Sequence, residues 1–166
     1  WIEGQLRLGE SENSTISFQE IILGIFIKRS AEFEKQGLDV SFDVSENCTL
    51  KMEPGGATII LNNIIQNAQK YTRKKIRIMG RVDKDNFVIL ELIDDGGGIN
   101  DSERLDQLNS GSAISSSVGR SGQLGSGLGL FMVSDIVNRN NGSIRFSNFK
   151  DGLKVELKFP HFEEAL

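Results

Sequence analysis

The chain has 166 residues, of which 38% are hydrophobic and 25% charged, and these proportions predict one globular domain with a substantial core. Its net charge of −4 argues against nucleic acid as a partner, because no basic surface is expected. Cys48 is the only cysteine, so a disulfide within the chain is impossible and we expect a reducing, cytoplasmic compartment. No apolar run approaches membrane-spanning length. Because the chain begins at Trp1 rather than Met, we expect a segment of a longer protein.

Helical periodicity and strand-like alternation predict the elements of the first half. Apolar residues recur at helical spacing in 19–36, where Ile22, Ile25, Phe26 and Phe33 share one face. In chain order we expect a linker at 1–13, a short strand or linker at 14–18, a helix at 19–36, a strand at 38–44, a strand at 48–52 that pairs with it, and a helix at 54–71.

Apolar runs bounded by turn residues predict two hairpins in the second half. The first is formed by 76–82 and 87–93, and the last by 143–149 and 153–159. The stretch 107–125 is rich in Ser and Gly, and we expect a mobile lid there, with a plain disordered linker as the alternative. Helices that alternate with such hairpins predict an α/β fold: a two-layer sandwich with a mixed, mostly antiparallel sheet, covered on one face by about three helices.

A carboxylate comes directly after the apolar run 87–93 and is followed by glycines. The sequence from Asp94 to Ile99 is Asp-Asp-Gly-Gly-Gly-Ile. An acid at the end of a buried strand is costly unless something uses it. The glycines allow positive φ angles and the close approach of another molecule. The pattern therefore predicts a small polar ligand at a strand end.

A polar stripe runs along the predicted helix 54–71 beside its buried face. Asn63, Asn67, Lys70 and Tyr71 stack there at helical spacing. Amide oxygens suit a hard cation and an ammonium suits phosphate, so the stripe predicts a metal–polyphosphate ligand. Three other polar residues of this helix are expected to point toward solvent: Asn62, Gln66 and Gln69.

A third group of glycines precedes a predicted helix that begins near Leu128. Gly125, Gly127 and Gly129 lie at its start, where free N–H groups and the helix dipole attract anions. The motif lacks the Gly-Lys-Ser/Thr of a P-loop, and its Gly-x-Gly-x-Gly spacing after a loop differs from the dinucleotide fingerprint. We expect the helix to be buried through Leu128, Met132, Val133, Ile136 and Val137.

These three motifs, in this order and at this spacing, resemble the ATP-binding domain of sensor histidine kinases. That domain has the Bergerat-type ATP-binding fold and is grouped with gyrase, the Hsp90 chaperones and the MutL repair proteins. The resemblance covers about 18–160. It implies a catalytic domain at 14–166 that uses ATP and Mg²⁺ and transfers the γ-phosphoryl group to a histidine on a separate dimerisation hairpin, which 1–13 would end. It also implies a response regulator as a downstream partner, and the isolated domain is expected to be a monomer.

The resemblance implies roles for individual residues. Asp94 would accept a hydrogen bond from the adenine amino group, because a carboxylate accepts and cannot donate. Asn67 would bind Mg²⁺, and Asn63 and Lys70 would lie at the catalytic centre. The other residues expected to contact the nucleotide are Tyr71, Gly96, Gly98, Ile99, Arg120, Gly125, Gly127, Leu128 and Gly129.

Asn63 also favours phosphoryl transfer over hydrolysis. The hydrolysing relatives carry a glutamate here, and asparagine lacks the basicity to activate water. The sole histidine, His161, lies outside any predicted helix, so we expect the acceptor histidine outside this chain. The family usually has a phenylalanine-containing motif between the second and third motifs. This chain departs from that pattern, because no phenylalanine occurs between Phe87 and Phe131. The missing motif leaves open a nucleotide-sensing module with degenerate catalysis. A hydrolysing ATPase is the other alternative, although Asn63 argues against it.

Overall fold

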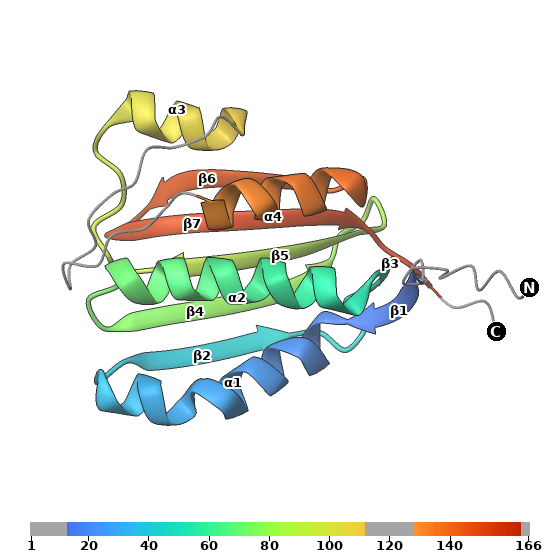
Figure 1. The fold of residues 1–166 in the computed structure, drawn as a ribbon, viewed down its shortest axis with the longest axis horizontal. Helices are drawn as coiled ribbons and strands as arrows, with labels where there is room; N and C mark the ends of the chain where they lie inside the picture. The colour runs from blue at the N-terminus through green and yellow to red at the C-terminus, as the bar shows by residue number, and fades with distance from the viewer. Residues whose placement is uncertain (1–12, 112–127, 164–166) are drawn as a thin grey trace, which may run out of the picture.

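Three helices cover one face of a five-stranded sheet in the computed structural model of the chain (Figure 1). The structure describes residues 13–111 and 128–163. The sheet has the order β2-β4-β5-β7-β6, in which β2 and β4 run parallel and each other pair of neighbours is antiparallel. The strands are β2 (Asp39–Val44), β4 (Lys75–Val82), β5 (Phe87–Asp94), β6 (Ser143–Phe149) and β7 (Gly152–Pro160).

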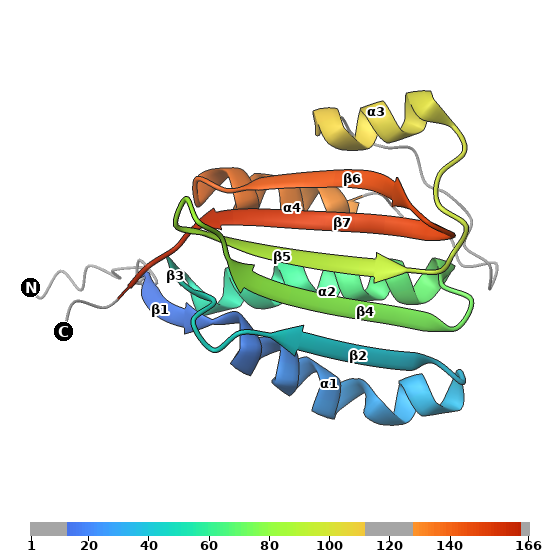
Figure 2. The same ribbon diagram turned by 180° about the vertical axis from the view of Figure 1, so that it is seen from behind.

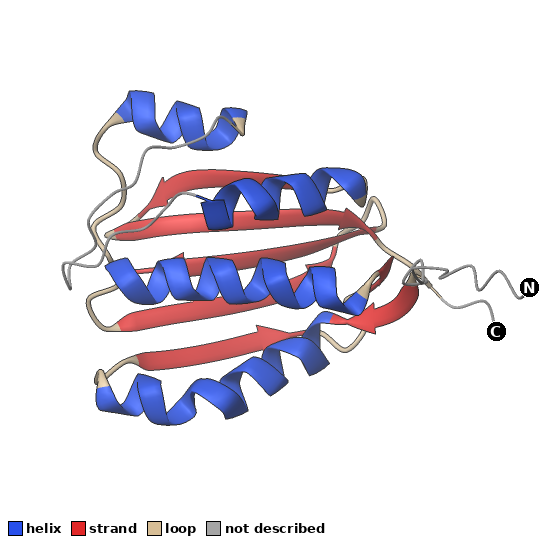
Figure 3. Cartoon of the chain, in the orientation of Figure 1, coloured by secondary structure: helices blue, strands red, loops and turns tan. Residues whose placement is uncertain are grey.

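The covering helices are α1 (Phe18–Lys35), α2 (Pro54–Tyr71) and α4 (Leu128–Arg139). They lie on the same side of the sheet, as the view from behind also shows (Figure 2), and the separation into a helical and a strand layer is plain in Figure 3. The predicted two-layer α/β sandwich is therefore confirmed. Within residues 13–111 and 128–163, no helix combines the length and the apolar character needed to cross a membrane.

Local sequence signals explain where the first two helices begin. Ser17 caps α1, because its hydroxyl accepts the N–H of Glu20 at 3.3 Å. Glu53 caps α2, and its carboxylate accepts the N–H groups of Gly55 and Gly56 at 3.2 and 3.1 Å. This carboxylate also suits the positive end of the helix dipole. The cap fixes the direction of α2, which carries the polar stripe.

The core fills the space between the helices and one face of the sheet. Phe18 and Phe159 are fully buried, with ring centroids 5.8 Å apart. Burying such a side chain stabilises the fold by roughly 1.5–3 kcal/mol. On α4 the buried stripe is formed by Val133 and Val137, whereas Met132, which we expected to be buried, is 46% exposed. The expectation failed because the buried face of α4 is the one turned toward α2 and β6, and Met132 lies on another side of the helix.

The strand at the predicted range 48–52 has a different partner from the expected one. β3 (Thr49–Met52) pairs antiparallel with β1 (Ser14–Ser17) in a separate two-stranded sheet, and not with β2. β2 pairs with β4 on one side, and its following turn directs the chain toward the start of α1, where the N–H of Phe18 donates to the carbonyl of Cys48 at 3.1 Å. The prediction that 48–52 pairs with 38–44 was wrong, because sequence alternation does not identify a strand's partner.

The start of the predicted lid is helical. α3 (Ser102–Ser110) includes residues 107–110, and it lies beyond β6, away from the other helices (Figure 1). Asp101 caps α3 by accepting the N–H of Glu103 at 3.0 Å, and Gly111 ends it in the left-handed conformation with φ 70°. These caps, with the burial of Leu108, overcome the weak helical pattern. The remainder of the predicted lid, 112–125, lies outside the described residues.

Candidate functional site

Asp94 ends β5 as a buried carboxylate with defined backbone donors. It is 8% exposed, and its Oδ1 accepts the N–H of Gly96 at 2.8 Å and that of Leu153 at 3.2 Å. Burial raises the pKa of Asp94 above its ordinary value, although the two N–H donors oppose the shift. Both of these donors use Oδ1, and neither binds Oδ2.

Asp95, the next residue, accepts hydrogen bonds from neighbouring groups of the protein itself. Its Oδ1 accepts the hydroxyl of Thr72 at 2.6 Å and the N–H groups of Arg73 and Lys74 at 2.8 and 3.0 Å. Although burial opposes ionisation, the hydrogen bonds, those of Lys74 and Thr72 foremost, hold the pKa of Asp95 well below its ordinary value. The two adjacent carboxylates therefore have different surroundings. Asp95 fastens the loop after β5 to the turn between α2 and β4.

The glycines of this loop meet protein groups on two sides. A Cβ on Gly96 would lie 2.6 Å from the carbonyl oxygen of Tyr71, at the end of α2. Gly97 has φ +94°, and its N–H donates to the carbonyl of Asp151 at 2.7 Å, in the turn between β6 and β7. The loop thus passes between the end of α2 and the β6–β7 turn, where larger residues would not fit.

The polar stripe of α2 faces α4. Asn63 Nδ2 donates to the carbonyl of Ile59 at 2.8 Å, and a Cβ on Gly129 would collide with Asn63 Oδ1. The amide oxygen of Asn63 therefore points at the first turn of α4. Asn67, one turn further along α2, is half-buried on the same stripe. Lys70, near the end of the helix, places its Nζ 5.3 Å from the ring centroid of Tyr71.

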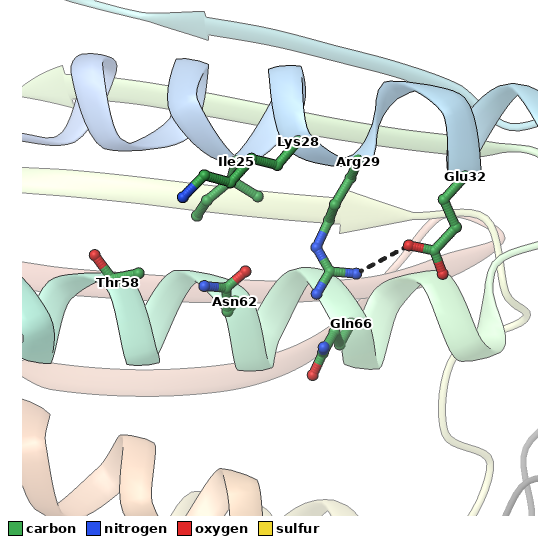
Figure 4. A pocket seen from close by; sticks show the side chains of 7 residues that line it. All are labelled: Ile25, Lys28, Arg29, Glu32, Thr58, Asn62 and Gln66. Atoms are coloured by element: carbon green, nitrogen blue, oxygen red, sulfur yellow. Dashed lines mark hydrogen bonds and ion pairs between the residues drawn. The ribbon is translucent and has the colours of Figure 1, made fainter.

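The other polar flank of α2 lies beside α1, which corrects our expectation for Asn62 and Gln69, because both are half-buried, whereas Gln66 is exposed as expected. Asn62 and Gln66 line a hollow of about 410 Å³ between α1 and α2 (Figure 4). Gln69 accepts from Arg29 at 3.2 Å and donates to Gln36 at 2.8 Å, both of which belong to α1 or its end. The expectation failed because residues flanking the buried stripe also meet the neighbouring helix.

The fold brings together predicted residues from all three motifs. Gly96 lies against Tyr71 at the end of α2, and Gly129 lies against Asn63 about two turns earlier, so α2 contacts both the loop after β5 and the start of α4. α4 begins at Leu128, so Gly129, one of the predicted phosphate glycines, lies in its first turn. Three predicted ligand residues, Arg120, Gly125 and Gly127, lie outside the described residues.

Sequence reasoning missed a contribution of the backbone. The N–H of Leu153 supports Asp94 from β7, across the sheet. Because the main chain makes this bond, the identity of the side chain carries no signal for it.

Gly129→Ala and Gly24→Ala form a matched pair of substitutions in helices. No heavy atom lies within 4 Å of a Cβ built on Gly24, so Gly24→Ala is expected to stabilise the chain by about 0.5–1 kcal/mol. Gly129→Ala is expected to lack this gain, because the new methyl group displaces the Asn63 side chain. Urea denaturation measures both changes. Equal stabilisation by the two substitutions would contradict the packing of Asn63 on Gly129.

A large class of ATPase domains shares these features: a two-layer sandwich, a buried acid at a strand end, a helix that carries asparagines, and a further helix with a glycine in its first turn. The chain belongs to the histidine kinase-, DNA gyrase B- and HSP90-like ATPase family, whose model matches residues 52–163. The chain is also similar to the sensor histidine kinase GraS of Staphylococcus haemolyticus (strain JCSC1435), with 23% identity over 163 residues, which are 95% of this chain and 47% of that protein. It therefore spans about half the length of this curated relative.

The similar solved structures are catalytic domains or larger parts of histidine kinases. A nucleotide-free catalytic domain of the histidine kinase ThkA has a TM-score of 0.77 at 21% identity, covering 90% of this chain and 96% of that one. Full-length ShkA in complex with AMPPNP has a TM-score of 0.75 at 19% identity, covering 95% of this chain and 33% of that one. At these identities the likeness establishes a shared fold.

Proposed function

We propose that the chain is the ATP-binding catalytic domain of a two-component sensor histidine kinase. The single observation that carries this proposal is the buried carboxylate of Asp94, held at the end of β5 by two backbone donors and placed beside the polar stripe of α2. The family and the fold support a nucleotide as the ligand. The parent protein would be a cytoplasmic or membrane-anchored sensor that signals to a response regulator, and the isolated domain would be a monomer.

Asp94 would select the base. Its Oδ2 would accept a hydrogen bond from the amino group of adenine, whereas guanine would present a carbonyl oxygen to the same carboxylate and be repelled. Gly96 and Gly98 would shape the loop beside the base, because a Cβ on either would meet protein atoms, the carbonyl oxygen of Tyr71 or Asn148 Oδ1. Ile99, which is half-buried beside them, would offer apolar contact to the ring.

Residues of α2 and the start of α4 would bind the phosphates. The half-buried amide of Asn67 fits Mg²⁺, which takes oxygen ligands and commonly shares them between one protein group and the phosphates. When bound, Mg²⁺ would supply neutralisation of the phosphate charge. Lys70 would add a positive charge, and the N–H groups at Leu128 and Gly129, with those of Gly125 and Gly127 before them, would donate to phosphate oxygens. Arg120 would add a second cation.

Asn63 favours transfer to an acceptor over attack by water. Its Nδ2 donates to the carbonyl of Ile59 and its Oδ1 lies against Gly129. The amide has no basicity with which to activate water. His161 does not suit the role of acceptor, because its backbone and ring both bind Asn86 at the turn between β4 and β5. The chain's own residues would thus orient the γ-phosphoryl group for a histidine on the dimerisation hairpin.

The test joins this chain to its upstream hairpin and measures acid-labile phosphohistidine after addition of Mg-ATP. The wild type is expected to form it, and Asn67→Ala is expected to reduce the initial rate at least about 100-fold through the loss of metal-bound phosphate positioning. Asn62→Ala is the matched control, because it removes an amide from the flank of α2 that faces α1. Nucleotide binding without phosphohistidine in the wild type would contradict transfer. An equal loss in both variants would contradict the role of Asn67.

A nucleotide-sensing module with degenerate catalysis is the second candidate, because the sequence lacks a phenylalanine between Phe87 and Phe131. In that case, amide exchange within 112–127 would differ between ADP and a non-hydrolysable ATP analogue although no phosphohistidine formed. Exchange that is indifferent to both nucleotides would exclude this candidate.

A further inference from the structure

Two asparagine side chains make the same pair of bonds to the main chain at the edge of the sheet. Asn148 Oδ1 accepts the N–H of Ile99 at 2.8 Å, and its Nδ2 donates to the carbonyl of the same residue at 2.9 Å. Asn109 Oδ1 accepts the N–H of Phe146 at 2.7 Å, and its Nδ2 donates to the carbonyl of Phe146 at 2.9 Å. In each case one carboxamide satisfies both polar groups of one residue.

The residue that Asn148 holds ends the loop that follows Asp94. Two of the three consecutive glycines in this loop, Gly97 and Gly98, have positive φ angles of +94° and +68°. Glycine has little intrinsic preference among backbone conformations, so such a segment needs outside contacts to keep one geometry. A Cβ on Gly98 would lie 2.6 Å from Asn148 Oδ1, which shows how closely the carboxamide packs on the loop.

Asp95 holds the start of the loop to the turn between α2 and β4, and two further hydrogen bonds come from the same hairpin as Asn148. The carbonyl of Asp151, in the β6–β7 turn, accepts the N–H of Gly97 at 2.7 Å, and the N–H of Leu153 donates to Asp94 at 3.2 Å. The main chain of the hairpin makes both bonds. Among the contacts that this hairpin makes with the loop, the one from Asn148 is made by a hairpin side chain, and a substitution in the hairpin can therefore remove it.

We propose that Asn148 is a positioning residue of the nucleotide site: by binding both backbone groups of Ile99, it fixes the loop from Asp94 to Ile99 in the geometry that receives the base. The inference rests on the proposed function, since it concerns the same site. Asn148 does not itself touch the nucleotide. It acts through Ile99 and Gly98, and its loss would let the loop leave the base-binding geometry for part of the time.

Asn109 supplies the matched control. It makes bonds of the same kind and number, to the edge strand β6 that carries Asn148, and both residues are exposed. It joins α3 to Phe146, however, and it makes no contact with the loop between Asp94 and Ile99 among its hydrogen bonds within 13–111 and 128–163. If such bonds only stabilised the fold, Asn148→Ala and Asn109→Ala would change the affinity for ADP equally.

The experiment titrates ADP by calorimetry into the full chain and its variants Asn148→Ala, Asn148→Asp and Asn109→Ala, and measures the melting temperature of each. Asn148→Ala is expected to weaken ADP binding about tenfold, and Asn109→Ala by less than about twofold, at similar losses of melting temperature. Asn148→Asp keeps the size of the side chain but turns an oxygen toward the carbonyl of Ile99, so it is expected to weaken binding at least as much as Asn148→Ala.

The outcomes separate this inference from the proposed function. ADP binding by the wild type with unchanged affinity in either Asn148 variant would overturn the positioning role alone. Equal losses of affinity in Asn148→Ala and Asn109→Ala would also overturn it, because the effect would then be general. Failure of the wild type to bind ADP would overturn the proposed function, and the inference with it.

Discussion

Asp94→Asn is expected to weaken ADP binding more than about 100-fold at neutral pH, because a charge-assisted hydrogen bond is lost and a buried donor is left unpaired. An asparagine that keeps its oxygen toward the N–H groups of Gly96 and Leu153 turns its NH₂ group toward the proposed adenine amino group. Two donors then face each other. Calorimetric titration of ADP measures the loss, and affinity within about fivefold of the wild type would contradict the proposed role of Asp94.

The same variant is expected to melt no lower than the wild type near pH 7. Burial raises the pKa of Asp94 in the folded chain, so the folded state favours the neutral carboxyl group. For such a group, stability falls as the pH rises from the unfolded pKa through the folded pKa, and the ionised form destabilises the fold at neutral pH. Asparagine removes this cost. Loss of binding at unchanged or raised melting temperature would separate a binding defect from unfolding.

Asp95→Ala is expected to have the opposite effect and lower the free energy of unfolding by about 2–4 kcal/mol, because three donors lose a charged acceptor. The buried hydroxyl of Thr72 and the N–H groups of Arg73 and Lys74 are these donors. Urea denaturation near pH 7 measures the change. A loss below about 0.5 kcal/mol would contradict the anchoring role of Asp95.

Asp95→Asn provides the control for charge, because it keeps an oxygen acceptor. The pKa of Asp95 is lowered in the folded chain, so the ionised carboxylate stabilises the fold above the unfolded pKa of about 3.9 and this contribution is lost as the pH falls below it. The wild type is therefore expected to exceed Asp95→Asn in stability at pH 7 by more than at pH 3. A difference that is independent of pH would contradict the role of the charge.

The sequence predicted those parts of the fold whose signals are local. Helix α2 was expected at 54–71 and is observed at Pro54–Tyr71, because a proline at its start and a long apolar stripe both mark it. The last hairpin was expected from its Asn-Gly and Lys-Asp-Gly turns, and β6 and β7 follow within one residue of the expected ends.

Features that depend on contacts distant in sequence could not be predicted. The pairing of β3 depends on tertiary packing, including the bond between Cys48 and Phe18. The formation of α3 likewise depends on the bonds that Asn109 makes to β6. The hydrogen bond from Leu153 to Asp94 is donated by the backbone N–H, so the type of side chain at 153 does not predict it. Asn148 was not singled out, because an asparagine near a turn is common and its two bonds to Ile99 span 49 positions.

The measurement that tests the central claim most directly is a pair of calorimetric titrations of the wild-type chain, one with Mg-ATP and one with Mg-GTP. A carboxylate that accepts from adenine and repels the carbonyl of guanine predicts binding of ATP at one site, with GTP at least about 100-fold weaker. Equal affinity for the two nucleotides would contradict base selection by Asp94. Failure to bind ATP at all would contradict the nucleotide site itself.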